Sequence, residues 1–326
     1  MTSNDTTPRP IKPVLVTGAP RSGTTWLGRM LTIGPELYYV HEPFNPLIKS
    51  SAAIYQLKIP HYFIHICEDN EVDFLEPTRR LMENRHDLMR GLLGVRSPRD
   101  VLDVLRNART SRERRARGAR PLIKDPIALM SAEWLARRFD MHCIVMIRHP
   151  AAFVASMKRL GWASHPEKWA LTQPLLMRDY LRPFEEQIRR MSEGEHDLIE
   201  RASLAWKMHH HVISLYKDRH PDWIFLRHED ISRDPPSSFE LLYARLGLPF
   251  TGEAQRVIAE HSGKANPERA TGSEKTLKLD SQLNISSWKH RLSTEEIDRI
   301  RGYVDDVARK FYADDDWHVG AKGVSP

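Results

Sequence analysis

A loop between two glycines near the start of the chain has the residues of a phosphate-binding cradle. Gly18 and Gly23 bracket it, after an apolar run and before an amphipathic stretch. Free backbone N–H groups at the beginning of a helix, at the positive end of its dipole, bind anions. The spacing fits G-x-x-x-x-G, but Thr24 stands where a nucleotide-hydrolysing P-loop has lysine. Arg21 instead brings a cation earlier in the loop, and Trp26 offers a flat face for an adenine.

A second candidate anion site follows a later apolar run. Residues 143–147 are typical of a buried strand that ends in Arg148, and the helix expected after it carries Ser156. If this strand lies beside the first one, both loops open at the carboxyl edge of the sheet, where open α/β folds bind ligands. Arg148 and Ser156 could then hold one phosphate monoester. The alternatives are a structural ion pair for Arg148 and an ordinary helix position for Ser156.

The elements that must position these residues alternate along the chain. Short apolar runs and amphipathic stretches follow one another, which predicts an α/β fold with a mostly parallel sheet covered on both faces. The predicted strands cover 14–17, 37–40, 122–124, 143–147 and 223–227. The predicted helices cover 24–32, 129–139, 150–159, 198–218, 237–246 and 294–312. Ser293 and Glu296 have the spacing of a capping box for the last of these helices.

The charge and the cysteine count of the chain limit the kinds of ligand and metal site that it can have. The 326 residues carry 49 Lys and Arg against 43 Asp and Glu, a net charge of +6. This balance suits anionic ligands without requiring nucleic acid, and an ordinary solubilising surface explains it equally well. The only two cysteines, Cys67 and Cys143, exclude a disulfide framework and a cysteine-rich metal site. Residues 1–12 lack a signal-peptide core and no run is long enough to span a bilayer, so a cytoplasmic protein is expected.

Two conspicuous segments have ordinary explanations. Residues 109–120 are dense in arginine and are expected to form a mobile surface loop or a frayed helix end, with a guide for an anionic substrate as the alternative. His209, His210 and His211 lie in a predicted helix, where successive side chains point about 100° apart and cannot bind one metal ion from one face. We expect these histidines at the surface.

Together, the two anion-binding segments resemble the sulfotransferase family that uses 3′-phosphoadenosine 5′-phosphosulfate (PAPS), in its carbohydrate-type and bacterial branch. Residues 20–25, followed by Trp26, are similar to the family's 5′-phosphosulfate loop, and residues 148–156 are similar to its 3′-phosphate motif. The resemblance implies a P-loop-like three-layer fold with a central, mostly parallel sheet flanked by helices. At 326 residues the chain can form either a single α/β domain with insertions or a domain with a helical cap. We expect the first, a single domain over 13–318 with insertions at about 50–120 and 160–200 that cover the acceptor side, between tails at 1–12 and 319–326.

The resemblance further implies metal-independent transfer of a sulfuryl group from PAPS to a hydroxyl or amine of a small-molecule, glycan or lipid acceptor. The donor-binding residues that it implies are Arg21, Ser22, Gly23, Thr24 and Thr25 for the phosphosulfate, Trp26 and His228 for the adenine, and Arg148 and Ser156 for the 3′-phosphate. The family closes the 3′-phosphate site with an Arg-Lys-Gly stretch, where this chain has Ser-Gln-Leu-Asn at 281–284. Lys289 or Arg291 could compensate. No nucleic-acid partner is implied, and the oligomeric state stays open.

The catalytic candidates lie at two strand ends. Glu42 resembles the glutamate of the Glu-Pro element that serves relatives as general base, a role that suits a carboxylate whose pKa is raised by partial burial. His41 is the reserve base, and a capping or pairing role at the strand end is the alternative for both. Lys124 is placed like the catalytic lysine of cytosolic relatives, or else pairs with Asp125 or another carboxylate. Arg21 is the candidate to stabilise the bridging oxygen.

Two other functions compete with this one. A P-loop kinase or NTPase would need Mg²⁺ ligands and a lysine that reaches the phosphates, and the sequence has neither at the expected places. A nucleotide-binding relative without turnover would keep the cradle but would tolerate changes at Glu42 and Lys124.

Overall fold

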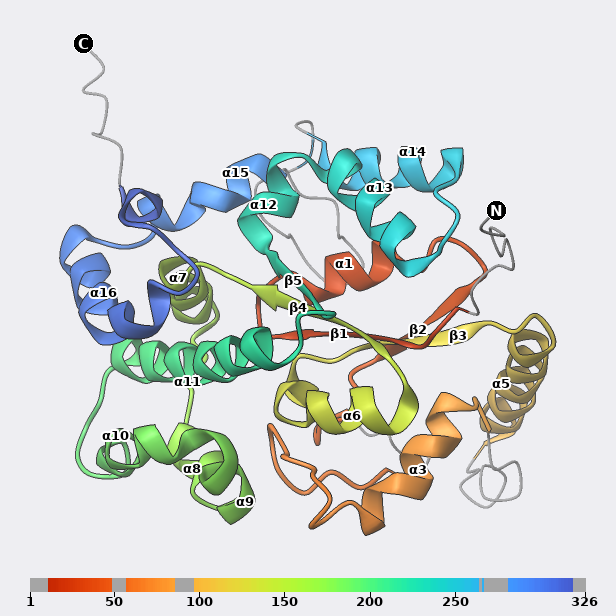
Figure 1. The fold of residues 1–326 in the computed structure, drawn as a ribbon, viewed down its shortest axis with the longest axis horizontal. Helices are drawn as coiled ribbons and strands as arrows, with labels where there is room; N and C mark the ends of the chain where they lie inside the picture. The colour runs from red at the N-terminus through yellow and green to blue at the C-terminus, as the bar shows by residue number, and fades with distance from the viewer. Residues whose placement is uncertain (1–10, 49–56, 86–96, 264–265, 267–280, 319–326) are drawn as a thin grey trace, which may run out of the picture.

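A five-stranded sheet lies at the centre of the protein. The computed structural model describes residues 11–48, 57–85, 97–263, 266 and 281–318. Within them the strands are β1 (Val14–Gly18), β2 (Leu37–His41), β3 (Arg120–Lys124), β4 (His142–Ile147) and β5 (Ile224–Arg227). They are all parallel, in the order β2-β3-β1-β4-β5 (Figure 1). The predicted strands are confirmed, with ends shifted by at most two residues.

The sheet separates two apolar cores because successive side chains of a strand point to opposite faces. Val14 and Val16 of β1 enter one core, and Leu15 between them enters the other. In β4, Ile144 joins the core of Val14, whereas Val145 joins that of Leu15. All five side chains are fully buried, as expected for a parallel sheet that is covered on both faces.

Helices cover both faces and complete three layers (Figure 1). One core contains α1 (Thr24–Met30), α13 (Pro235–Leu246) and α14 (Gly252–Ser262). The other contains α6 (Ala132–Phe139), α7 (Pro150–Leu160), α11 (Leu198–Arg219) and α16 (Thr294–Ala308). The fold is therefore the predicted P-loop-like α/β architecture.

The remaining described helices are short or lie at the periphery. They are α3 (Val72–Met82), α5 (Pro98–Ala116), η1 (Ile127–Ser131), α8 (Pro166–Ala170), α9 (Pro174–Leu176), η2 (Met177–Leu181), η3 (Arg182–Phe184), α10 (Glu185–Arg190), α12 (His228–Arg233), α15 (Ser281–Ser286), η4 (Ser287–His290) and η5 (Asp314–Trp317). No helix among the described residues combines the length and apolar character needed to cross a bilayer.

The predicted helix boundaries mostly lie within two residues of the observed ones. The helix expected over 129–139 divides into η1 and α6, and the one expected over 294–312 ends at Ala308. The predicted capping box is confirmed, because Ser293 accepts from the Glu296 N–H and the Glu296 carboxylate accepts from the Ser293 N–H. Nearly all of the predicted tails, 1–12 and 319–326, falls outside the described residues.

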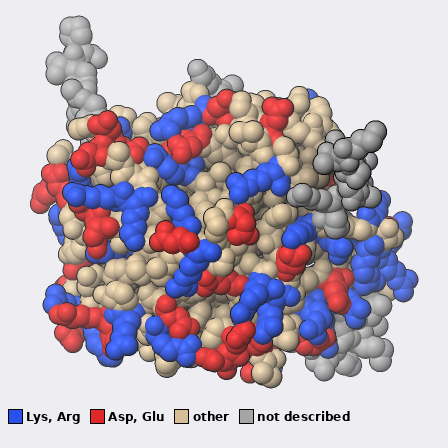
Figure 2. Space-filling view, in the orientation of Figure 1, with Lys and Arg blue, Asp and Glu red and all other residues tan. Residues whose placement is uncertain are grey.

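The prediction of a surface loop over 109–120 is wrong, because most of these residues form the end of a helix. Residues up to Ala116 belong to α5, and Arg120 begins β3. Glu113, the only acidic residue of 109–116, accepts from Arg109 one helical turn earlier at 2.9 Å, and Arg115 donates to the Asn84 carbonyl at 3.2 Å. Figure 2 shows Lys and Arg side chains crowded at the edge of the molecule where Figure 1 places α5.

The prediction that the three histidines lie at the surface is also wrong for two of them. His209 and His210 are buried in α11, which packs against α7, α8 and α16. The His209 ring contacts Phe63 at a centroid distance of 4.5 Å, and the His210 ring stacks on Trp206 at 3.9 Å. Burial lowers the pKa of both histidines to about 3, so they are neutral aromatic packing residues at neutral pH.

Candidate active site

The loop between β1 and α1 requires glycine at both ends. Gly18 has a φ of 135°, and a Cβ there would lie 2.2 Å from the Met146 carbonyl oxygen of β4. Gly23 has a φ of 92°, and a Cβ there would lie 2.6 Å from Cδ2 of His228. A side chain fits at neither position, so the loop is pressed between β4 and α12 with its backbone N–H groups at the start of α1.

The two predicted anion-binding segments meet at this loop. The Arg21 Nε donates to the Ser156 hydroxyl of α7 at 3.2 Å, and the Arg148 Nη1 donates to the Arg21 carbonyl at 2.8 Å. Arg21 has a φ of 65°, an uncommon conformation for a residue with a side chain. We call Arg21, Arg148 and Ser156 the donor cradle. Neighbouring strands β1 and β4 bring it together at the carboxyl edge of the sheet.

Arg148 is a buried cation without an ion pair among the described residues. It is 9% exposed, and within the described ranges its guanidinium donates only to the Arg21 carbonyl and, at 3.4 Å, to the Asn284 side-chain oxygen. Its Nε is buried and has no acceptor within the described part of the chain. Burial lowers the pKa of Arg148 to about 10, against the opposing charge of Glu229. An anion at the guanidinium would offset this desolvation.

More cations surround the donor cradle. Burial lowers the pKa of Arg21, and the charge of Arg159 lowers it further. The charge of Arg291 likewise lowers the pKa of Arg148. Arg159 was not among the predicted residues, although it lies three positions after Ser156 and so on the same face of α7. This concentration of positive charge fits a ligand that carries more than one anionic group.

Segment 281–284, which replaces the Arg-Lys-Gly stretch of the family, brings Asn284 to Arg148. The Asn284 side-chain oxygen accepts from Arg148. Lys289, which was predicted to compensate for the missing Arg-Lys-Gly stretch, instead donates to the His318 carbonyl. Arg291 affects Arg148 electrostatically, as its predicted role would require. The position of residues 281–284 in the chain had indicated this segment, but not a contact of Asn284 with Arg148.

Other predicted donor residues lie on or beside α1. Thr24 is buried and Thr25 half-buried in its first turn, and the Ser22 hydroxyl donates to the Ala19 carbonyl at 2.6 Å. Trp26 meets the Phe239 ring of α13 edge to face at 5.2 Å. Its proposed contact with adenine stays a prediction.

Trp162 lies beside the donor cradle, after α7. Its ring is 52% exposed, and its centroid is 5.9 Å from Cζ of Arg21. An exposed indole next to a guanidinium is a favourable cation–π arrangement.

Glu42 and Lys124 form the second part of the site, which we call the reaction pair. His41 of β2 lies in register with Lys124 of β3, so Glu42 follows directly at the strand end. The Lys124 ammonium donates to Glu42 Oε1, and Asn45 donates to Oε2 at 2.7 Å. Lys124 is 1% exposed and Glu42 16%, so the pair is largely removed from water.

The pKa of Glu42 differs from expectation. Burial alone would raise it, but the charge and hydrogen bond of Lys124, with the hydrogen bond from Asn45, bring it below its usual value. The expected raised pKa is therefore wrong, and Glu42 is ionised at neutral pH. The alternative of an ion pair for Lys124 is confirmed, with Glu42 as the partner. The reserve base His41 stacks on Tyr39 at a centroid distance of 6.1 Å.

Asp125, predicted only as a possible partner of Lys124, instead fixes the backbone around the reaction pair. Its fully buried carboxylate accepts from the N–H groups of Phe44 at 2.6 Å, Ile127 at 2.9 Å and Ala128 at 3.3 Å. Burial, together with the charge of Glu42, raises the pKa of Asp125 to about 7. An Asp-Pro pair directly after a strand is the turn signal that could have indicated this role.

The family model described as "Sulfotransferase family" matches residues 13–252. The chain belongs to the sulfotransferase family. This confirms the family predicted from the two motifs. No curated protein matches the sequence.

Solved sulfotransferases align with this family member at low identity. The sulfotransferase domain from the Synechococcus PCC 7002 olefin synthase has a TM-score of 0.47 and 16% identity, over 96% of this chain and 99% of that one. The sulfotransferase domain from the curacin biosynthetic pathway has a TM-score of 0.46 and 16% identity, over 90% and 97%. Sulfotransferase STF9 from Mycobacterium avium has a TM-score of 0.44 and 16% identity, over 93% and 77%.

Proposed function

We propose that this sulfotransferase-family protein transfers a sulfuryl group from PAPS to a hydroxyl or amine of a glycan or small natural product. One observation carries the proposal. Arg148 is buried beside a helix-start anion cradle and has no carboxylate ion pair among the described residues. A phosphate on the 3′ carbon of the donor would supply the missing anion, and that phosphate is what distinguishes PAPS from ATP.

The donor cradle fits such a ligand on the chemistry of its donors. In the proposal, Arg148 and Ser156 bind the 3′-phosphate, while the backbone of residues 22–25 and the hydroxyl groups of Thr24 and Thr25 bind the phosphosulfate at the start of α1. Trp26 and His228 lie on the adenine side. Arg291 adds charge next to Arg148. When bound, PAPS supplies an activated sulfate.

In the proposal, the reaction pair removes the proton of the acceptor hydroxyl. Glu42 accepts the proton of the acceptor hydroxyl as that oxygen bonds to sulfur and the bridging S–O bond breaks. Lys124 keeps Glu42 ionised and oriented, and Arg21 faces the oxygen that leaves with the 5′-phosphate. His41 is the second choice of base. The protein's residues thus supply positioning and fixed charge, as in-line group transfer requires.

The setting of the reaction is also a proposal. Cys67 and Cys143 are both free thiols, which suits a reducing compartment such as the cytoplasm. The domain assignment, a single sulfotransferase domain over 13–318, is likewise proposed.

Calorimetry tests the donor. We expect 3′-phosphoadenosine 5′-phosphate, the product form of the donor, to bind more tightly than ATP with Mg²⁺. Preference for ATP would favour a kinase or NTPase, for which Asp125 makes a poor Mg²⁺ ligand because three N–H groups already occupy its oxygens. A screen of glycan, phenol, lipid and peptide hydroxyls with labelled PAPS then identifies the acceptor. Tight donor binding with no turnover on any class would indicate a non-catalytic relative.

A further inference from the structure

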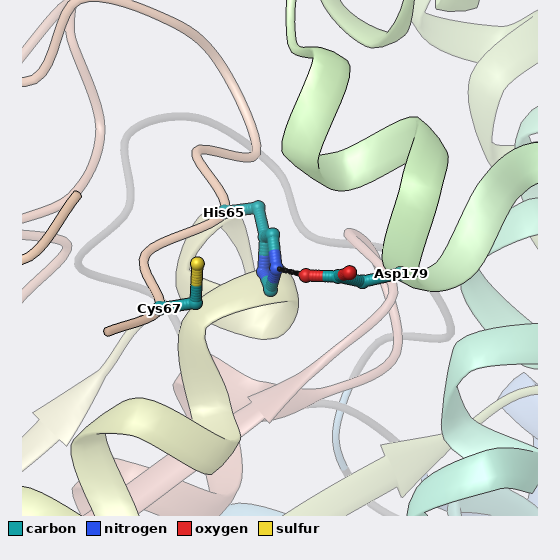
Figure 3. Close-up of side chains that lie close together, drawn as sticks. All are labelled: His65, Cys67 and Asp179. Atoms are coloured by element: carbon teal, nitrogen blue, oxygen red, sulfur yellow. Dashed lines mark hydrogen bonds and ion pairs between the residues drawn. The ribbon is translucent and has the colours of Figure 1, made fainter. Parts of the chain in front are cut away.

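Three potential metal ligands, none of them a residue of the donor cradle, lie close together in the structure. His65 and Cys67 belong to the segment that precedes α3, and Asp179 belongs to η2 in the 160–200 insertion. One ligand atom from each lies within 4.8 Å of the others. Figure 3 shows the imidazole of His65 with Asp179 on one side and Cys67 on the other. The three residues therefore join two parts of the chain that are more than 100 positions apart.

His65 makes the supporting hydrogen bond that is usual for a metal-binding histidine. Its Nδ1 lies 2.8 Å from the Met130 carbonyl, which can only accept, so Nδ1 carries the hydrogen. Its Nε2 then lies 2.8 Å from the Asp179 carboxylate. In a neutral ring this nitrogen would present a lone pair to a carboxylate oxygen, which is unfavourable. A cation is needed there, either a second proton or a metal ion.

The segment that carries His65 and Cys67 is held rigidly by side chains. The His65 N–H donates to Gln173 at 3.0 Å, and the Ile66 N–H donates to Ser131 at 3.0 Å. The Cys67 N–H donates to Asn70 at 2.8 Å, and Asn70 donates back to the His65 carbonyl at 2.9 Å. Three consecutive backbone donors are thus satisfied by side chains. Such fixing of the backbone keeps two ligands in place before any metal ion binds.

Asp179 is positioned by an unusual helical turn. It lies in η2, a π-helical turn, and such turns are frequent at functional sites. Arg178 donates to both oxygens of Asp179, at 2.6 and 3.1 Å, and also pairs with Asp69 at 2.8 Å. These contacts orient the carboxylate, although the arginine charge reduces its attraction for a cation. The thiol of Cys67 supplies the soft donor that favours zinc-like ions over Mg²⁺ or Ca²⁺.

We propose that His65, Cys67 and Asp179 bind one zinc-like divalent transition-metal ion, which clips the segment before α3 to η2. Three N, S and O ligands plus one water complete a tetrahedral zinc site. Two ligand atoms about 2.0 Å from a tetrahedral ion lie about 3.3 Å apart. Nε2 and the Asp179 oxygen must therefore separate slightly from 2.8 Å, and the Cys67 side chain must turn toward Nε2.

This role is structural and does not depend on the proposed sulfuryl transfer. Cys67 is half-buried and His65 is buried, and neither contacts the donor cradle in the described contacts. The segment and the insertion that the ion joins are the regions expected to cover the acceptor side. A metal ion there would make this cover more stable without taking part in the reaction.

Metal titration of the metal-free full chain, carrying no polyhistidine tag, tests the proposal. We expect one Co²⁺ per chain with a thiolate charge-transfer band in the near ultraviolet, and we expect Zn²⁺ to displace it and to raise the melting temperature. Cys67→Ser should abolish the band and weaken Zn²⁺ binding at least about tenfold. Asp179→Asn should weaken binding but keep the band. Cys143→Ala, which removes the buried thiol of β4, is the matched control and should bind as the wild type does.

Three results would contradict the proposed metal site. They are the absence of one-to-one binding, a charge-transfer band that survives Cys67→Ser, and Zn²⁺ binding that leaves the melting temperature unchanged. Any of them would mean that a second proton on Nε2 of His65, and not a metal ion, faces the Asp179 carboxylate. Calorimetry with 3′-phosphoadenosine 5′-phosphate on Cys67→Ser separates the two proposals, because we expect donor binding to be unaffected by this substitution.

Discussion

Arg148 and Lys124 are two buried cations at the same edge of the sheet, and they differ in what neutralises them. Lys124 has its counter-ion within the chain, because Glu42 accepts from it directly. Arg148 has only neutral oxygens as hydrogen-bond partners among the described residues. A buried cation without an anion is costly, whereas a buried pair is close to neutral in cost. The donor cradle is therefore organised for a ligand, and the reaction pair is organised before any ligand arrives.

This difference separates binding from chemistry. Filling the donor cradle with an anion should stabilise the protein, since the ligand completes an ion pair that the fold leaves open. The reaction pair gains nothing comparable, because its charges already compensate each other. Substitutions in the two regions should thus have effects of different kinds.

The largest expected effect is on the rate. Glu42→Gln should lower kcat by about 10²- to 10⁴-fold, because the carboxylate that we propose takes the acceptor proton is lost. The dissociation constant of 3′-phosphoadenosine 5′-phosphate should stay nearly the same in calorimetry. Glu240→Gln, at an exposed position of α13, is the control and should keep full activity. A fall in donor affinity equal to the fall in rate would remove the distinction between the two regions.

The next effect is on stability and its pH dependence. Lys124→Met should lower the free energy of unfolding by about 3 kcal/mol at pH 7, because it leaves the Glu42 carboxylate buried and unpaired. In the wild type the lowered pKa of Glu42 stabilises the fold above its usual pKa, and this contribution is lost as the pH falls. Without Lys124, burial raises the pKa, so stability should instead decrease as the pH rises.

Urea unfolding of Lys124→Met at pH 4 and pH 7 measures this reversal, with Arg148→Met as the matched comparison. Arg148→Met removes a cation that has no ion pair among the described residues, so the ligand-free protein should lose little stability. Equal losses for the two variants would contradict the comparison.

A smaller effect is expected on affinity. Arg148→Ala should weaken the binding of 3′-phosphoadenosine 5′-phosphate by about 2 kcal/mol, which raises its dissociation constant roughly 30-fold. This loss is typical of a charged hydrogen bond. An analogue without the 3′-phosphate should bind both proteins alike. Arg256→Ala, at a 66% exposed position of α14, controls for net charge. If both ligands weakened equally, Arg148 would not contact the 3′-phosphate.

The smallest effect checks that general destabilisation does not imitate these results. Ser293→Ala removes the hydroxyl of the capping box of α16 and should lower the free energy of unfolding by about 1 kcal/mol. Neither kcat nor donor affinity should change. A loss of activity in this variant would mean that both regions are sensitive to any loss of stability.

Local patterns were sufficient to predict the sheet and the cradle. Strands β1 and β4 are short apolar runs, and the spacing of Gly18 and Gly23 indicated an anion-binding loop directly after β1. The capping box of α16 is equally local, since it needs only Ser293 and Glu296. These features depend on residues within a few positions of one another.

Contacts between distant segments could not be predicted in the same way. Asn284 lies at Arg148 from 136 positions away, and no periodicity carries such information. The pKa of Glu42 depends on Lys124, 82 positions later, so partial burial alone gave the wrong direction. His209 was misplaced because α11 is covered by several helices, and neighbouring sequence does not show how many sides of a helix are buried.

The indole of Trp162 gives the protein a built-in optical reporter. It is half exposed to water and faces the guanidinium of Arg21, which belongs to the donor cradle. An anion bound at Arg21 would change the surroundings of this ring, so we expect its fluorescence to change. The protein has eight tryptophans, so subtracting the signal of Trp162→Phe would isolate this response. Occupancy of the cradle could then be followed in real time without labelling the protein.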